Sequence, residues 1–156
     1  MIRVMFVCHG NICRSPMAEF ILKYLVKKAG LEKDFVIESC ATSTEEIWNG
    51  IGNHIYPPAQ AELKKNNIPF DHDKRAVQIC KNDYEKYDYF LCMDTNNIRN
   101  ALWILGNDPE NKLKLLMSYT DHSRNVSDPW YSRNFNTAFN DIFEGCESFL
   151  KKITAK

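Results

Sequence analysis

A cysteine and an arginine lie six positions apart near the start of the chain, in a segment whose residue types suit phosphate chemistry. Cys8 follows a β-branched and aromatic run, residues 2–7, and Arg14 precedes an apolar-periodic run, residues 17–26. This order predicts a strand, a tight loop and a helix start, so backbone N–H groups and the positive end of a helix dipole converge on one point. We expect an anion to bind there, and a cysteine beside such a site is typically a nucleophilic thiolate.

The other residues of this segment, the 8–15 loop, have the types that such a site needs. The planar guanidinium of Arg14 can bind two phosphate oxygens at once, which a lysine cannot do. Gly10 permits a turn without a Cβ, and Asn11 tolerates a left-handed conformation. Ser15 can hydrogen-bond the thiolate or cap the helix, and Pro16 suits a first helical turn. The predicted phosphate-binding residues are His9, Gly10, Asn11, Ile12, Cys13, Arg14 and Ser15.

At these residues the chain resembles the low-molecular-weight protein tyrosine phosphatases. The resemblance lies in residues 7–19 (VCHGNICRSPMAE), 89–94 (YFLCMD) and 128–131 (DPWY), which come in the family's order and cover essentially the whole length. It implies one α/β domain with a four-stranded parallel sheet, and it implies the catalytic residues Cys8 as nucleophile, Arg14 as phosphate binder and Asp128 as general acid.

The Asp128-Pro129 pair has a chemical reason to act as the acid. Release of a tyrosine must expel a phenolate, whose conjugate acid has a pKa near ~10, and a carboxylic acid over the leaving oxygen eases that departure. The polar segment 118–132 could fold over the site, and the same carboxylate could then activate water against a phosphocysteine. By itself Asp-Pro is a common turn starter, so its catalytic role depends on the resemblance.

Aromatic residues suggest what the site accepts. Trp130 and Tyr131 follow the acid and are predicted to form one wall of a slot for an aryl phosphate. By resemblance another wall comes from residues 42–52, which carry Trp48; the alternative is that Trp48 is a surface residue covering the core. Many relatives have a tyrosine pair after Asp-Pro that can be phosphorylated, and Trp130 leaves Tyr131 as the one candidate.

The resemblance also implies a support for the 8–15 loop. Asn11 would be held by hydrogen bonds from Ser15, from Ser39 after the second strand, and from His72, although His72 could instead be an ordinary loop histidine. Cys13 could trap an oxidised Cys8 as a disulfide, or it could simply pack under the loop.

Length and composition limit the function classes. A chain of 156 residues predicts one domain over residues 1–156 with a sizeable core. Its 20 basic and 20 acidic residues give no electrostatic case for nucleic acid or an anionic membrane, and no apolar run approaches the ~20 residues of a membrane span.

The cysteines and histidines bear on compartment and metal binding. Six irregularly spaced cysteines do not predict a disulfide scaffold. A cysteine nucleophile must be reduced, so a cytoplasmic protein is expected. His54 and His122 show no ligand spacing with any cysteine, so neither a metal nor another cofactor is predicted.

The predicted elements alternate along the chain. Such alternation predicts a three-layer α/β sandwich, with a central four-stranded parallel sheet and helices on both faces. The predicted strands are residues 2–7, 35–39, 89–93 and 113–116, and the main helices are 16–29, 59–66, 95–105 and 135 onward, with long loops at 40–58 and 121–132.

Three functions are consistent with this pattern. The first is a phosphatase that acts on phosphotyrosine proteins and holds inorganic phosphate or a similar oxyanion in the 8–15 loop. The second is a thiol-dependent arsenate reductase, which would pass a disulfide along Cys8, Cys80 and Cys92. The third is a phosphotyrosine-binding module, which would need neither Cys8 nor Asp128. The Asp128-Pro129 acid favours the first.

Overall fold

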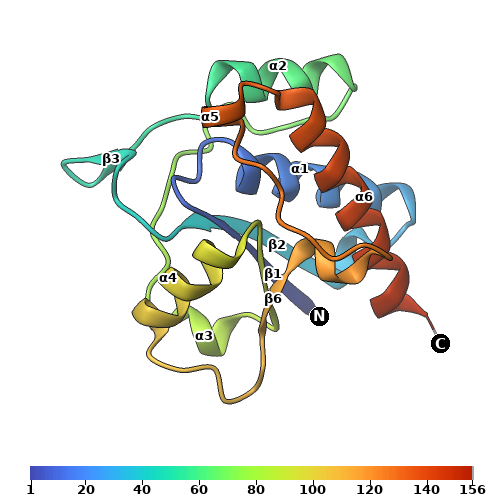
Figure 1. Cartoon of the computed structure of the whole chain (residues 1–156). Helices are drawn as coiled ribbons and strands as arrows, with labels where there is room; N and C mark the ends of the chain where they lie inside the picture. Colours follow the sequence, from blue (N-terminus) through green and yellow to red (C-terminus); the bar gives the residue numbers. More distant parts are fainter. Residues whose placement is uncertain (156) are drawn as a thin grey trace.

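The centre of the molecule is a parallel sheet whose middle strand ends at Cys8. The computed structural model describes residues 1–155, and its four strands have the order β2-β1-β5-β6 (Figure 1). All three neighbouring pairs are parallel, with Cys8 opposite Ala41 on one side of β1 and Val7 opposite Cys92 on the other. The strands are β1 (Ile2–Cys8), β2 (Phe35–Ala41), β5 (Tyr89–Cys92) and β6 (Leu113–Leu115).

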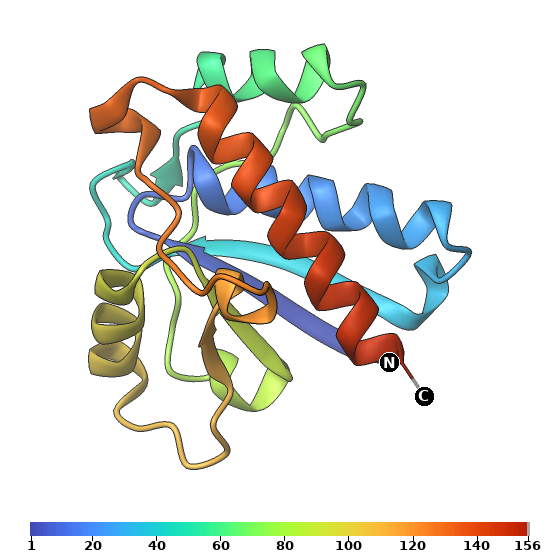
Figure 2. The ribbon, with the colours of Figure 1, turned by 45° about the vertical axis from the view of Figure 1, so that its right-hand side comes forward.

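Helices cover both faces of this sheet, which confirms the predicted α/β sandwich. Helices α1 (Arg14–Lys28), α2 (Pro57–Lys65) and α6 (Phe135–Thr154) lie on one side, and α3 (Asp83–Lys86) and α4 (Thr95–Leu105) lie on the other (Figure 2). Short 3-10 turns, η1 (Glu32–Asp34) and η2 (Leu116–Tyr119), join some of the elements.

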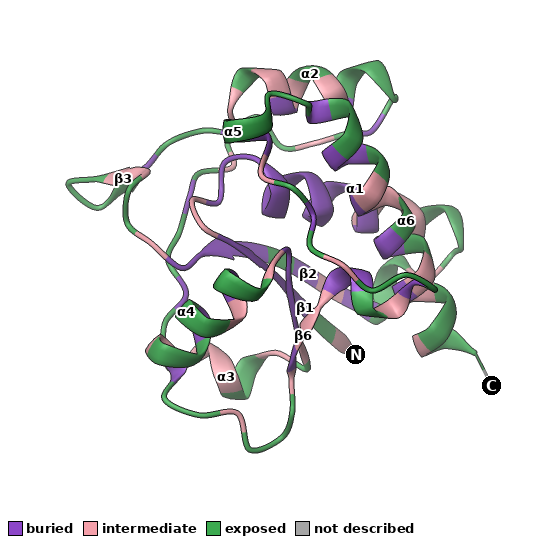
Figure 3. Ribbon diagram, viewed as in Figure 1, coloured by how far each residue is buried: buried purple, intermediate pink, exposed green. Residues whose placement is uncertain are grey.

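The two faces of β1 contribute to separate hydrophobic clusters. Val4 and Phe6 pack under α1 and α6, whereas Met5 and Val7 pack with residues of α4 on the opposite face. This alternation follows from the period of two of a strand. The central strands are buried along most of their length, and the outer sides of the helices are exposed (Figure 3).

Two segments that the sequence predicts as loops contain short elements. Residues 40–58 include an antiparallel hairpin, β3 (Ile47–Trp48) and β4 (Ile51–Gly52), whose turn residues Asn49 and Gly50 both have positive φ. Residues 121–132 include the one-turn helix α5 (Pro129–Ser132). Elements of two to four residues are too short to produce a periodic pattern. Within residues 1–155, no helix is long and apolar enough to cross a membrane.

Candidate active site

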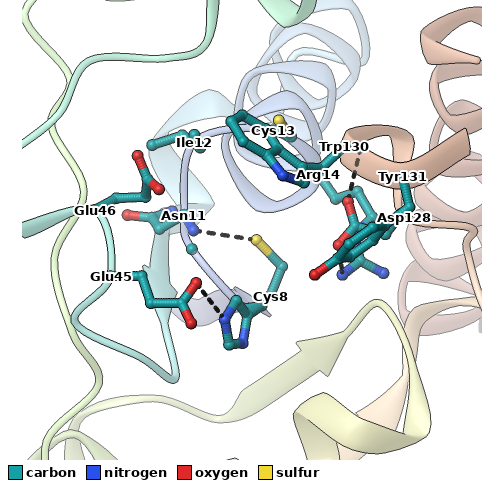
Figure 4. A pocket seen from close by; sticks show the side chains of 12 residues that line it. Cys8, Asn11, Ile12, Cys13, Arg14, Glu45, Glu46, Asp128, Trp130 and Tyr131 are labelled. Atoms are coloured by element: carbon teal, nitrogen blue, oxygen red, sulfur yellow. Dashed lines mark hydrogen bonds and ion pairs between the residues drawn. The ribbon is translucent and has the colours of Figure 1, made fainter. Parts of the chain in front are cut away.

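The 8–15 loop curls around the sulfur of Cys8 at the carboxyl end of β1. The N–H of Asn11 points at Cys8 Sγ from 3.3 Å (Figure 4). Ser15 Oγ lies 3.0 Å from the same sulfur. Helix α1 begins at Arg14, directly after the loop, so its positive end faces the same point. The N–H of Asn11, the hydroxyl of Ser15 and the first turn of α1 thus surround the sulfur, which faces a pocket.

Arg14 is buried and held by groups from two other segments. Its Nη1 donates to Asp94 Oδ2 (2.7 Å) and to the carbonyl of Val126 (2.9 Å), and its Nη2 lies 3.5 Å from Asp128 Oδ2. Burial alone would lower the pKa of Arg14, but the negative charges of Cys8, Asp94 and Asp128 outweigh it and raise the pKa. The guanidinium is therefore a fixed cation beside the sulfur.

Asp94 was missed as a site residue, although the sequence contains a signal for it. It follows β5 at the carboxyl edge of the sheet, and its Oδ1 accepts from the N–H of Asn97 as the N-cap of α4. A capping aspartate directly after a central strand lies at the edge where parallel sheets bind ligands.

Asp128 faces the pocket from the opposite side. As the N-cap of α5 it uses Oδ1 to accept from the N–H of Trp130 (3.0 Å), while Oδ2 lies 3.5 Å from Arg14 Nη2. The N–H of Val126 donates to the carbonyl of Met93 (2.8 Å), which ties this segment to the end of β5. One carboxylate oxygen is thus fixed by the backbone, and the other is directed at the anion position.

Asn11 has the left-handed conformation that the sequence predicts, with φ at 60°. Its Nδ2 donates to Ser15 Oγ (2.8 Å) and to Ser39 Oγ (3.0 Å), and its Oδ1 accepts from the N–H of Val77 (3.1 Å). All the polar atoms of the buried amide head are therefore engaged, which holds the backbone in a conformation that a non-glycine residue rarely adopts.

The pocket beside Cys8 is lined by loop residues and by side chains from two other segments (Figure 4). Trp130 and Tyr131 lie on the side of Asp128, as predicted, and the ring of Trp130 packs 4.9 Å from that of Tyr56. Glu45 and Glu46 lie at the mouth, where Glu45 pairs with His9 (2.9 Å). A carboxyl group, a guanidinium, a cysteine sulfur and aromatic side chains therefore meet in one pocket, and these groups suit transfer of a phosphoryl group from an aryl ester.

Comparison with known proteins supports this chemistry. A sequence profile described as "Low molecular weight phosphotyrosine protein phosphatase" matches residues 3–156. The chain belongs to the low molecular weight phosphotyrosine protein phosphatase family. It is 37% identical to the protein of that description from Gallus gallus, over 96% of this chain and 94% of the relative. It is also 37% identical to YfkJ from Bacillus subtilis, whose crystal structure superimposes with a TM-score of 0.91 over 98% of this chain and 94% of the other.

A third relative agrees with this assignment. The low molecular weight protein tyrosine phosphatase from Streptococcus pyogenes is 35% identical, with a TM-score of 0.87 over 100% of this chain and 95% of that chain. This chain is accordingly a hydrolase of the protein tyrosine phosphatase class, and the family's phosphocysteine chemistry fits the position of Cys8.

The prediction for His72 is wrong. In this phosphatase its exposed ring packs against Phe70, with ring centroids 4.4 Å apart, and no hydrogen bond joins it to the 8–15 loop within residues 1–155. Lys74 faces the support instead: its Nζ donates to the carbonyl of Ser39 (3.1 Å). The chain turns between residues 71 and 74, so a position two residues later faces inward.

Behind this support lies a buried carboxylate that sequence reasoning did not single out. Glu19 on α1 accepts from Ser39 Oγ (2.6 Å) and from Lys23 Nζ (2.7 Å), and Lys74 Nζ lies 3.7 Å from its Oε1. The sequence signal for this role is the spacing of Glu19, which lies one helical turn after Ser15 and one turn before Lys23. Residues at that spacing share one face of a helix. In the phosphatase Ser39 thus holds Asn11, and Glu19 holds Ser39. The two lysines neutralise the buried carboxylate of Glu19.

The prediction that Trp48 forms a slot wall is also wrong. Trp48 lies in the β3–β4 hairpin, is 80% exposed, and does not line the catalytic pocket. A short hairpin with an Asn-Gly turn carries its end away from the body of the phosphatase (Figure 1). Glu45 and Glu46, which come just before β3, occupy this side of the mouth instead.

The other cysteines differ from Cys8 in their surroundings. Burial, with the charges of Cys8 and Asp128, raises the pKa of the Cys13 thiol well above its usual range, so it is protonated at neutral pH. Cys92 is buried within β5, and Cys80 is exposed. All six cysteines are free thiols, and the Cys8–Cys13 disulfide stays a prediction. Within residues 1–155, no group of three or more metal-ligating side chains is assembled.

Proposed function

We propose that residues 1–156 act as one catalytic domain that hydrolyses phosphotyrosine through a phosphocysteine at Cys8. The observation that carries this proposal is the convergence of three groups on one pocket: the Cys8 sulfur, the Nη2 side of the Arg14 guanidinium, and Asp128 Oδ2. We assign the phosphate oxygens to the loop N–H groups of residues 9–15 and to Arg14.

In the first step the Cys8 thiolate attacks phosphorus in line with the phenolic oxygen. The S–P bond forms as the P–O bond breaks, and the loop N–H groups and Arg14 stabilise the charge on the equatorial oxygens. Asp128, protonated, gives its proton to the departing phenolic oxygen, so tyrosine leaves as a neutral phenol. The N–H of Trp130 holds Oδ1, which leaves Oδ2 to carry that proton.

In the second step water cleaves the phosphocysteine. Asp128, now a carboxylate, takes a proton from the water as its oxygen attacks phosphorus, and the S–P bond breaks to release inorganic phosphate. The hydroxyl of Ser15 lies 3.0 Å from Cys8 Sγ and donates to the departing thiolate. Cys8 is then ready for another cycle, and Asp128 has regained its proton.

The walls of the pocket support a planar aryl group as the leaving group. Trp130 and Tyr131 offer apolar surface on the side where the phenol departs. We infer that the substrates are proteins bearing phosphotyrosine, that inorganic phosphate and similar oxyanions compete in the 8–15 loop, and that the protein works in the cytoplasm, where free thiols persist.

The test is hydrolysis of p-nitrophenyl phosphate and of a phosphotyrosine peptide by reduced protein in the presence of EDTA, with Cys8→Ser as the comparison. We expect release of phosphate by the wild type and background rates from Cys8→Ser, and a trapped 18.2 kDa protein carrying phosphate on Cys8 after acid quench. Thioredoxin-dependent reduction of arsenate that disappears in Cys80→Ser would favour the reductase. Tight binding of the peptide without turnover would favour the binding module.

A further inference from the structure

The segment that carries the proposed general acid, residues 120–128, contains no helix or strand and crosses the surface between η2 and α5 (Figure 2). Between residues 121 and 127 only Val126 is buried. Packing therefore fixes this segment at one point, two residues before Asp128. A segment with so few buried side chains opens locally at low cost unless polar contacts hold it, so its other contacts decide how well the acid is placed.

Arg124 supplies such contacts, because its guanidinium joins the segment to α6. Its Nη2 donates to Asp141 Oδ1 (2.8 Å) and to Glu144 Oε1 (3.0 Å), and its Nη1 donates to the carbonyl of His122 (2.8 Å). Asp141 and Glu144 are three residues apart and share one face of the helix. Since Ile142 between them is fully buried, the helix holds both carboxylates at a fixed place.

The contact between Arg124 and Asp141 closes a loop of chain that contains one side of the catalytic pocket. It spans 17 positions, and these include Asp128, Trp130 and Tyr131, which all line the pocket. Closing a loop reduces the conformations that are open to the residues within it. Arg124 and Asp141 do not line the pocket themselves, so their effect on catalysis has to be transmitted through this chain.

We propose that Arg124 is a positioning residue for the general acid: its pairs with Asp141 and Glu144 hold residues 124–128 against α6, so that Asp128 Oδ2 lies beside the leaving oxygen. The N–H of Val126 ties the segment to the end of β5, and Arg124 ties it to α6. Two separate anchors fix the direction of the segment as well as its position, which one anchor cannot do. This inference rests on the proposed phosphatase function.

The loss of this anchor should affect catalysis more than folding. The side chain of Arg124 is 29% exposed, so solvent screens its ion pairs and they contribute little to the stability of the whole chain. A small displacement of a group at the reacting centre is costly, in contrast, because proton transfer depends closely on distance and direction.

The experiment measures kcat/KM for phenyl phosphate and for p-nitrophenyl phosphate, whose leaving group is more acidic and needs the acid less. It compares wild type, Arg124→Gln and Arg99→Gln, with and without Asp128→Asn. Arg99 on α4 is exposed and does not line the catalytic pocket, so its variant removes the same charge elsewhere. A general acid contributes about 10²–10⁴-fold. We expect Arg124→Gln to lose part of this, roughly five- to twentyfold for phenyl phosphate and less than about twofold for p-nitrophenyl phosphate.

Two further comparisons identify Asp128 as the group through which Arg124 acts. In Asp128→Asn no acid remains to be positioned, so adding Arg124→Gln should change kcat/KM by less than about twofold. The double variant Asp141→Asn and Glu144→Gln should reproduce the result of Arg124→Gln, whereas Arg124→Lys, which keeps the charge, should recover part of the activity. Urea unfolding checks that each variant is folded, and the double variant on α6 decides the question if Arg124→Gln is not.

Equal losses for the two substrates, an unchanged kcat/KM for phenyl phosphate, or a loss that persists in the Asp128→Asn background would overturn the proposal. Arg99→Gln should match wild type on both substrates, and a similar loss in that variant would attribute the effect to net charge instead. Absence of hydrolysis of either substrate by wild type and by Arg99→Gln would refute the phosphatase function itself.

Discussion

Lys74 offers a sharp test of how the 8–15 loop is supported. Its Nζ donates to the carbonyl of Ser39 (3.1 Å) and lies 3.7 Å from Glu19 Oε1, and its side chain is 12% exposed. Lys23 binds the other oxygen of the same carboxylate at 2.7 Å but is 41% exposed. The substitutions Lys74→Met and Lys23→Met each remove one positively charged neighbour of Glu19 and keep a similar side-chain volume. A comparison of the two variants therefore shows whether the position and burial of the lysine matter, or only its charge.

The structure predicts that the two substitutions lower the free energy of unfolding by different amounts. Removal of one partner from a buried ion pair costs about 3–5 kcal/mol when the other charge is left alone. In Lys74→Met the carboxylate of Glu19 is still paired with Lys23. We therefore expect the free energy of unfolding to fall by less, about 1.5–3 kcal/mol, which is typical of a hydrogen bond to a charged group. Lys23 is 41% exposed, so solvent screens part of its ion pair with the buried Glu19. We therefore expect Lys23→Met to lower the free energy of unfolding by less, about 0.5–1.5 kcal/mol.

Activity should follow the same order, because Ser39 holds the amide of Asn11 and thereby the shape of the loop. We expect kcat for p-nitrophenyl phosphate to fall about tenfold or more in Lys74→Met, since small displacements at a reacting centre are costly. Lys23→Met should stay close to wild type, and Lys74→Arg should recover part of the loss. Urea unfolding and steady-state kinetics measure both quantities. Equal stability and kcat in the two methionine variants would refute the reasoning.

Three further results are expected. Asp128→Asn cannot donate the proton to the leaving group, so kcat/KM, which reports formation of the phosphocysteine, should fall about 10²–10⁴-fold for phenyl phosphate. It should fall by less for p-nitrophenyl phosphate, whose leaving group is more acidic; equal losses in kcat/KM would contradict the role of general acid. Gly52→Ala makes the new Cβ collide with the carbonyl oxygen of Ala76, and should lower the free energy of unfolding by about 1–3 kcal/mol in urea titrations. Burial opposes ionisation of Asp108, but hydrogen bonds from Tyr84 and two backbone N–H groups prevail and lower its pKa. Its stabilising effect should therefore be complete above about pH 4 and be lost as the pH falls further, so the difference in stability between wild type and Asp108→Asn should shrink in acid.

The sequence alone determined the parts of the site that are local in the chain. Cys8, Asn11, Arg14 and Ser15 lie within eight residues, and their spacing between a strand and a helix start dictates which groups face the anion. The long helices and the parallel sheet were also predictable, because apolar periodicity extends over many residues in each.

The tertiary structure alone decided which distant side chains complete the site. Lys74 rather than His72 faces Ser39, since the turn at residues 71–74 and the hydrogen bond from the N–H of Val77 to Asn11 Oδ1 fix which residues of that segment point inward. Trp48 lies outside the pocket because a two-residue strand and its turn carry it away, and no periodicity in the sequence encodes that direction. Contacts between residues 20 and 112 positions apart depend on strand register and loop geometry, which local sequence pattern does not specify.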